Sequence, residues 1–344
     1  MTERVIRIPI EITIRVGNPQ TGAPGATVTT AEPADASAGE EMVIDENYDH
    51  RKGFDENFLG RNAKVEMPTL TKSALELVSV PDGSDEDEYL LHYYHYSLSM
   101  NKKRRLLFFA ASNTTRNPDL FGKQSRVALG DGQGEKWILD PRIPPAHQAT
   151  TRELYTKIHF DRGHIVRRED SYWGETPLLA KYANFDTFHY TNCTPQAPDY
   201  NRSNKQGIWG LLENYIAKQA GEQEVKLSLI AGPVLNDRDP ILKDTEVRVP
   251  RSFWKIVLGR IKGGDSSLGA WAFLLSQAKQ VKDAREGVFD PGEFGVYQVP
   301  ISQIEELTEV RFSDQIKAAD QAGNQEGVGW RPIEDVSQIK GAWG

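Results

Sequence analysis

Cysteine is almost absent from the sequence, because Cys193 is the only one among 344 residues. An internal disulfide and a cysteine-based metal cluster are therefore excluded, and a reducing, cytoplasmic location is the default expectation. No run of about 18 apolar residues occurs. We therefore expect no membrane-spanning helix and no membrane partner. Residues 1–17 lack the basic start, continuous apolar stretch and cleavage site of a signal peptide, although delivery by another route stays open.

Positive charge is scarce in the first hundred residues. They hold 8 Lys+Arg against 18 Asp+Glu, a balance of −10, whereas the rest hold 33 against 31, a balance of +2, and the two add to −8. The acidic excess therefore lies in the N-terminal part, and the remainder can carry a local basic groove for phosphate substrates. With 38% hydrophobic residues, the chain can bury the core of one large domain or two small ones.

The first 40 residues combine a strand pattern with a linker pattern. From Val5 to Val16 apolar side chains alternate with mostly polar ones, which predicts a strand with one buried face, and Pro9 favours an edge position. Residues 18–40 are rich in Gly, Ala, Thr and Pro, which is typical of a flexible linker. The strand within residues 1–17 either packs on its own domain or docks by β-augmentation on a partner or sister subunit. The extensions at residues 41–88 and 313–344 carry no functional signal.

Hydrophobic periodicity predicts an α+β protein with mainly antiparallel strands. Residues 89–100 and 106–111 are expected to form a hairpin with the basic cluster 102–105 at its turn. Apolar residues recur at helical spacing over 208–219, which predicts an amphipathic helix. Further strands are expected at 225–231, 247–258 and 270–275.

Two segments hold the residue types that phosphodiester hydrolysis requires. The first contains Arg162 and His164, and the second contains Asn192, Asn201 and Glu213. Histidine suits deprotonation of water near neutral pH, and arginine suits the developing negative charge on phosphorus. An amide oxygen such as that of Asn201 can anchor Mg²⁺, with the Glu213 carboxylate holding metal-bound water.

Each of these residues also has a purely structural interpretation. A lone histidine is more often structural or exposed, and Arg167 and Arg168 can pair with neighbouring acidic residues on the surface. Asn192 and Asn201 suit turns or helix caps, and Glu213 suits a solvated helix face. Residue types alone therefore leave both interpretations open, and the order of the motifs has to decide.

The motif order resembles that of the DNA/RNA non-specific endonuclease family, the ββα-metal nucleases that include endonuclease G. The first motif stands complete as Asp161-Arg162-Gly163-His164. The second is matched by an ordered set of residues, namely Asn192, Pro195, Gln196, Asn201, Trp209 and Leu212-Glu213. The resemblance covers roughly residues 89–312, the expected nuclease domain, and two ordered motifs with matching flanks are specific evidence.

The resemblance implies a ββα-metal fold, with a central mainly antiparallel sheet flanked by helices, and a role for each matched residue. It makes His164 the general base and Asn201 the direct protein ligand of Mg²⁺, with Mn²⁺ as an alternative. It also implies that Arg162 binds the scissile phosphate, that Glu213 holds metal-bound water, and that Asn192 orients the site. The remaining expected substrate-binding residues are basic, namely Arg167, Arg168 and the weaker candidate Arg126. Because the gap before Trp209 is longer than in other members, Asn204 is a rival metal ligand.

The expected reaction is hydrolysis of DNA, RNA or both to 5′-phosphate and 3′-hydroxyl ends with little sequence preference, because contacts to backbone phosphates carry no base information. One alternative is a non-catalytic nucleic-acid-binding module on the same fold. Another is a nuclease effector subunit of a larger assembly, such as a defence or toxin system, docked through residues 5–16. An inhibitor or assembly partner at those residues and a homodimer both stay open.

Overall fold

The computed structural model describes residues 43–85, 87–117, 119–120, 136–150, 155, 160–223, 226–242, 245–261, 268–278, 296–322 and 331–332. The chain divides into two compact units, residues 1–38 and 39–344. The strand expected at residues 5–16 and the linker expected at 18–40 lie outside the described residues. The architecture below is that of the second unit.

A large antiparallel sheet forms the centre of this unit. Its strand order is β12-β10-β9-β8-β7-β4-β3-β2, and every neighbouring pair is antiparallel. The strands are β2 (Leu90–Tyr93), β3 (Tyr96–Asn101), β4 (Leu106–Thr115), β7 (Lys226–Pro233), β8 (Ser252–Arg260), β9 (Leu268–Ser276), β10 (Val296–Val299) and β12 (Arg331–Pro332). The predicted α+β class with a mainly antiparallel central sheet is therefore confirmed.

The hairpin expected before residue 111 is present but contains one more turn than predicted. The tyrosine-rich stretch is not one strand, because β2 and β3 pair with each other across a two-residue turn at Tyr94 and His95. His95 adopts a φ of +68°, which such tight turns commonly require. The basic cluster forms the next turn, between β3 and β4, as expected.

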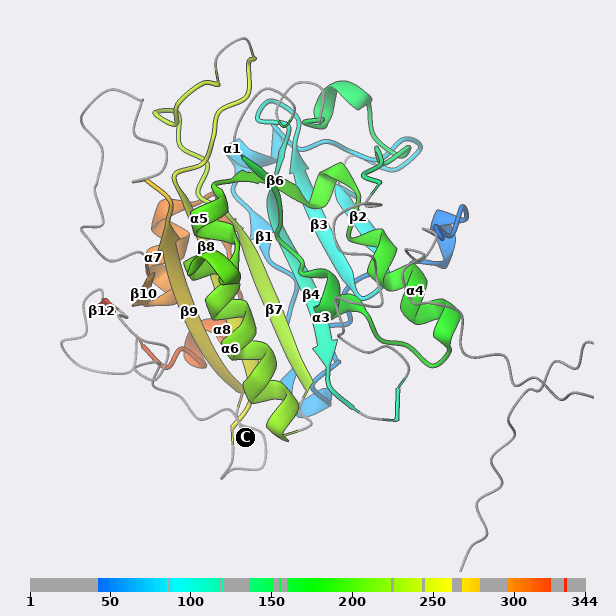
Figure 1. Cartoon of the computed structure of the whole chain (residues 1–344), viewed down its shortest axis with the longest axis vertical. Coiled ribbons are helices and arrows are strands. Elements are labelled where there is room, and N and C mark those ends of the chain that lie inside the picture. The colour runs from blue at the N-terminus through cyan, green and yellow to red at the C-terminus, as the bar shows by residue number, and fades with distance from the viewer. Residues whose placement is uncertain are drawn as a thin grey trace, which may run out of the picture. The chain divides into compact units, whose positions relative to one another are not determined.

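One face of the sheet is covered by α6 (Ile208–Gln223), which begins where the periodicity predicts and ends later. Trp209, Leu212 and Ile216 of α6 pack with alternate residues of β8 and β9, which are Phe253, Val257, Trp271 and Phe273. Figure 1 shows α6 lying across the front of the sheet, with α5 (Pro198–Asn201) close to its beginning. This face carries the segments of both motifs.

The opposite face is covered by segments from both ends of the described chain. The elements here are η2 (Arg61–Ala63), β1 (Thr69–Leu70), α1 (Lys72–Leu75), α7 (Ile301–Leu307), β11 (Val310–Arg311) and α8 (Asp314–Ala318). Val65, Ala74, Ile304 and Ile316 pack with the inward residues Trp254, Ile256 and Leu274. Parts of residues 43–85 and 313–322, whose role the sequence left open, therefore help to build the core on this face of the sheet.

The remaining elements include the motif segments themselves. They are η1 (Tyr48–His50), η4 (Pro145–His147), β5 (Asp161–His164), α3 (Arg168–Ser171), α4 (Pro177–Asp186), η5 (Tyr190–Asn192), β6 (Cys193–Gln196) and η6 (Ser203–Lys205). Within the described ranges, no helix has the length and apolar character needed to cross a membrane.

Candidate active site

The two motifs meet in a two-stranded antiparallel ladder. β5 consists of the complete first motif, and it pairs with β6 so that Asp161 faces Gln196 and His164 faces Cys193. The short helix α5 follows β6 at once and ends at Asn201. Segments about 30 residues apart in sequence thus form one ββα unit. This unit contains both the candidate base, His164, and the candidate metal ligand, Asn201.

Asn201 is held by the first residue of the first motif. Its Nδ2 donates a hydrogen bond to Asp161 Oδ2 at 3.1 Å. Arg202 binds the same carboxylate, with Nε 2.8 Å from Oδ2 and Nη2 2.5 Å from Oδ1. Since the amide nitrogen of Asn201 is engaged, its Oδ1 is the atom left to bind a cation.

Arg162 and His164 lie beside the same indole ring. They are two residues apart on β5 and therefore project from the same face of the strand. The His164 ring centroid is 4.6 Å from that of Trp137 and 5.1 Å from that of Phe188, whose ring it meets edge to face. The Arg162 guanidinium carbon is 5.7 Å from the Trp137 ring centroid. Aromatic packing thus holds the histidine ring: the residue as a whole is partly exposed, and the ring nitrogen Nε2 is buried.

Asn192 holds the backbone that follows the candidate base. Its Oδ1 accepts a hydrogen bond from the Val166 amide at 2.9 Å, and its Nδ2 donates to the carbonyls of Val166 and Thr187 at 3.0 Å each. The residue is fully buried, so all three contacts are sheltered from water. Asn192 therefore positions the chain two residues beyond His164, as an orienting role requires.

Glu213 projects from α6 into a buried group of charges. Its Oε1 accepts a hydrogen bond from Lys255 Nζ at 3.0 Å, and the lysine side chain is only 2% exposed. The same ammonium lies 4.2 Å from the Trp209 ring centroid. Burial raises the pKa of the Glu213 carboxyl, and the positive charges of Lys255 and Arg167 oppose that shift.

The expected substrate-binding arginines occupy different environments. Arg167 donates from Nε to Glu169 and from Nη2 to Asn214, both at 2.9 Å. Arg168 is buried, with its guanidinium 5.8 Å from the Phe188 ring centroid. Arg126 lies outside the described residues. Among the arginines expected to contact substrate, Arg162 is the one that lies on the ladder of β5 and β6.

Gln277 is a site-supporting residue that the sequence analysis missed. Its Oε1 accepts a hydrogen bond from the amide of Ala197, the residue just before α5, and its Nε2 donates to the carbonyls of Pro195 and Pro250. This buried amide ties the ββα unit to the large sheet. An isolated glutamine after a strand has no sequence signature, so only the fold could reveal it.

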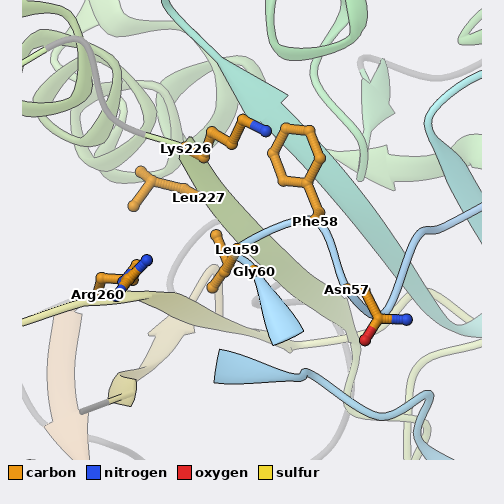
Figure 2. A pocket seen from close by; sticks show the side chains of 7 residues that line it. All are labelled: Asn57, Phe58, Leu59, Gly60, Lys226, Leu227 and Arg260. Carbon is orange, nitrogen blue, oxygen red and sulfur yellow. The ribbon is translucent and has the colours of Figure 1, made fainter. Parts of the chain in front are cut away.

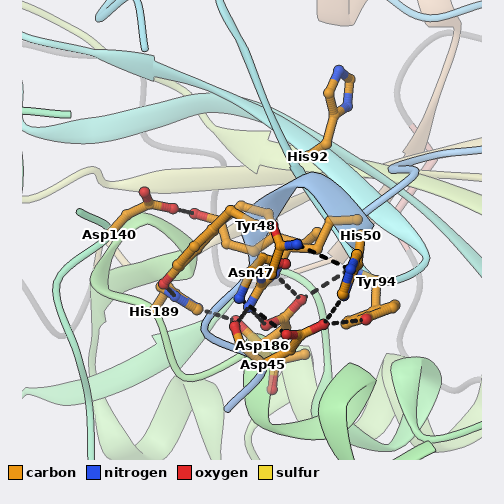
Figure 3. A network of polar contacts seen from close by, with 12 residues as sticks. Asp45, Asn47, Tyr48, His50, His92, Tyr94, Asp140, Asp186 and His189 are labelled. Carbon is orange, nitrogen blue, oxygen red and sulfur yellow. Dashed lines mark hydrogen bonds and ion pairs between the residues drawn. The ribbon is translucent and has the colours of Figure 1, made fainter. Parts of the chain in front are cut away.

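A second supporting group comes from residues 45–51 (Figure 3). Arg51 forms a buried ion pair with Asp186, and Tyr48 Oη lies 2.7 Å from Nε2 of His189. Burial lowers the pKa of His189, which favours a neutral ring at this contact. These bonds fasten a segment that precedes the predicted nuclease domain to the loop that carries Asn192.

The donor set suits a metal ion held mainly by water. Across the described part of the chain, no three His, Cys, Asp or Glu side chains gather in a way that could hold a metal ion. The Asn201 amide oxygen is a hard, neutral donor, and such oxygens are ligands that Mg²⁺ accepts while it keeps several waters. The residues present therefore fit a hydrated Mg²⁺ or Mn²⁺ on one amide oxygen.

Comparisons with known proteins identify the family to which the chain belongs. The model of the DNA/RNA non-specific endonuclease family matches residues 73–319. An uncharacterized protein of Sinorhizobium fredii is 30% identical over 93% of this chain and 48% of its own length. A nuclease of Nostoc is 30% identical over 50% of this chain and 57% of its own, and the mitochondrial nuclease EXOG of Xenopus laevis is 24% identical over 64% and 56%.

The chain spans about half the length of the curated relatives that it matches. The family match nevertheless covers most of this chain and contains both motifs, the ββα unit and every strand of the large sheet except β12. The chain belongs to the DNA/RNA non-specific endonuclease family.

Proposed function

We propose that this protein is a metal-dependent endonuclease that hydrolyses phosphodiester bonds of DNA, RNA or both. The observation that carries the proposal is the ββα unit, in which Asp161 on the strand of His164 holds the amide of Asn201. Family membership supports the same reaction class. A dead copy used only for binding would have no chemical need for either His164 or Asn201.

In the proposed mechanism His164 accepts a proton from a water molecule, and the resulting hydroxide attacks phosphorus. The bond from phosphorus to the 3′ oxygen breaks, and that oxygen takes a proton from solvent, which leaves a 5′-phosphate and a 3′-hydroxyl. Arg162, on the same face of β5 as His164, binds the phosphate oxygens as their charge grows. Packing against Trp137 and Phe188 keeps the imidazole in one orientation.

Asn201 would hold Mg²⁺ or Mn²⁺ through Oδ1, and the bound ion would supply positive charge at the phosphate and at the leaving oxygen. Asp161 and Arg202 keep the amide turned so that this oxygen is presented. Glu213, paired with Lys255, would accept hydrogen bonds from metal-bound water. Asn192 keeps the strand end of His164 in place.

The test is incubation of the purified full chain with plasmid DNA and with a structured RNA, each with Mg²⁺, with Mn²⁺ and with a chelator. We expect nicking and then linearisation of the plasmid, degradation of the RNA, or both, in the presence of metal only. End-labelling should find 5′-phosphates and 3′-hydroxyls. No cleavage of either polymer with either metal would refute the proposal, and cleavage in the chelator would refute its metal-dependent step.

A further inference from the structure

A hollow lies between the beginning of β7 and the loop that precedes η2 (Figure 2). Its volume is about 470 Å³, and its lining includes Phe58, Leu59, Gly60, Lys226, Leu227 and Arg260. This size falls within the range of sites for small organic ligands and exceeds what a lone inorganic ion needs. Gly60 has a φ of +104°, so the backbone of this part of the lining requires a glycine.

Two cations flank the hollow. Lys226 is the first residue of β7 and Arg260 the last of β8, and both side chains are exposed. Ser228 faces Leu258 in this antiparallel pair, so continuing the register by two residues on each strand sets Lys226 opposite Arg260. Like charges directly opposite each other in a sheet repel and destabilise it.

Neither cation forms a salt bridge within the described part of the chain. No carboxylate there forms a salt bridge with Lys226 or Arg260, whereas Lys64, Arg104, Arg116 and Arg142 each have one. The Lys226 ammonium instead lies 4.7 Å from the Phe58 ring centroid. Two cations that line one hollow favour an anionic ligand there.

The hollow is separate from the candidate active site. α5 and Asn201 lie near the beginning of α6, whereas Lys226 follows the end of this 16-residue helix. A helix of that length spans about 24 Å. The chemistry of the two places also differs, since the hollow offers two cations, apolar side chains and the amide of Asn57, but no histidine or carboxylate among its lining residues.

We propose that this hollow is a second, non-catalytic site for a nucleoside 5′-phosphate, either free or at the end of a strand. Lys226 and Arg260 bind the phosphate from two sides, and the arginine is suited to bidentate contact with its oxygens. The apolar side chains of Leu59 and Leu227 give the sugar and base a surface to cover. The choice of a 5′-phosphate rests on the proposed function, because that reaction creates such ends.

Binding is measured with the full-length His164→Ala protein in chelator, so that oligonucleotides stay intact. The probes are a nucleoside 5′-monophosphate, the matching nucleoside, inorganic phosphate, and one short oligonucleotide with either a 5′-phosphate or a 5′-hydroxyl. We expect the double variant Lys226→Gln/Arg260→Gln to weaken binding of the phosphorylated probes by about tenfold or more. The matched control is Lys103→Gln/Arg238→Gln, which changes one exposed lysine and one exposed arginine elsewhere and should leave affinity within about twofold.

Thermal unfolding separates binding from folding. Without ligand, the Lys226→Gln/Arg260→Gln protein should be close to its parent in stability, because removal of the like-charge contact offsets loss of the contact between Lys226 and the Phe58 ring. The 5′-monophosphate should raise the melting temperature of the parent and not of the double variant. Equal affinity of the double variant and its control for the monophosphate would overturn the proposal, and so would equal affinity for the nucleoside and its phosphate.

The two oligonucleotides distinguish the sources of the ligand. A preference for the 5′-phosphorylated strand means that strand ends are bound, whereas binding of the free nucleotide alone means a small-molecule site, and either result supports the phosphate site. When His164 is intact, the Lys226→Gln/Arg260→Gln protein should cut plasmid at the parental rate. A chain without nuclease activity that still binds the monophosphate through Lys226 and Arg260 would refute only the proposed function.

Discussion

Arg51 donates hydrogen bonds from Nε and Nη2 to the two carboxylate oxygens of Asp186, at 2.9 and 2.8 Å, and both side chains are at most 1% exposed. The residues are 135 positions apart in sequence. The same aspartate accepts a hydrogen bond from the backbone amide of Tyr94. One buried pair thus joins the segment before the sheet, the first hairpin and the end of α4.

Removing the cation of that pair should be costly. Arg51→Met leaves Asp186 as an uncompensated buried charge, which costs about 3–5 kcal/mol of unfolding free energy. The double variant Arg51→Met/Asp186→Asn should recover part of that loss, because no unpaired charge is left. Urea unfolding of the two variants and the parent measures both effects. If the double variant is no more stable than Arg51→Met, the loss comes from packing and not from charge.

Replacing His164 should remove turnover and leave the fold intact. His164→Ala deletes the proposed base, and loss of a general base typically lowers the rate by about a hundredfold to ten-thousandfold. Initial rates of plasmid cleavage at saturating Mg²⁺ give the comparison, and circular dichroism gives the fold. His50→Ala is the control, because that side chain is 60% exposed and belongs to another segment. Near-parental turnover of His164→Ala would remove His164 from the mechanism.

The metal ligand can be assigned by comparing two asparagines. Asn201 is bound to Asp161, whereas Asn204 is an exposed residue of η6. Asn201→Ala should raise the Mg²⁺ concentration for half-maximal activity by about tenfold or more. Loss of a metal ligand weakens metal binding at least as much as loss of a residue that hydrogen-bonds to a ligand. Asn204→Ala should leave that concentration unchanged, and the reverse pattern would make Asn204 the ligand.

The glycine of the first motif should not tolerate a side chain. A Cβ at Gly163 would lie 2.2 Å from Oε1 of Gln196 and 2.5 Å from its Cγ, and Gln196 is fully buried. Gly163→Ala is therefore expected to lower the free energy of unfolding by about 1–3 kcal/mol, as overpacking does. Adding Gln196→Ala should restore part of the loss. Chemical denaturation of the single and double variants checks this, and additive losses would show that the two residues do not collide.

Stability should fall in mild acid partly because of His95. Burial lowers the pKa of this ring to about 4, and the ring stacks on Trp173 with centroids 3.5 Å apart. Because the folded-state pKa lies below the unfolded one, the native state binds fewer protons, so this stabilisation is complete above about pH 6.5 and is lost as pH falls toward 4. The linked change is on the order of 3 kcal/mol.

Urea unfolding at pH 7.5 and pH 5 measures this effect. His95→Asn, which tolerates the positive φ, should lose less stability between the two pH values than the parent. An unchanged pH dependence in His95→Asn would show that this ring does not titrate in the window.

Local patterns in the sequence predicted the parts of the fold that depend on neighbours in the chain. The periodicity placed the beginning of α6 correctly, and the strands expected near β7 and β9 lie close to their predicted bounds. β8 begins five residues later than expected, because the apolar residues Val247 and Val249 pack in a preceding loop. The turn at His95 was missed because it contains no glycine, asparagine or proline.

The sequence predicted the motifs of the candidate site but not the contacts that hold them in place. The ladder of β5 and β6 brings together the two segments that the sequence singled out. By contrast, the pairing of Glu213 with Lys255 and the anchoring of α5 by Gln277 join residues 42 and 80 positions apart. A single sequence carries no signal for such contacts, because they depend on how separate elements pack.

The ladder of β5 and β6 is a sheet of its own, distinct from the eight-stranded one. Side-chain bonds such as those of Gln277 attach it to the larger sheet. The free energy of opening the ladder can therefore be lower than that of global unfolding. Sequence changes in this ladder are therefore expected to alter the local motion of the motif residues while leaving the stability of the eight-stranded sheet unchanged.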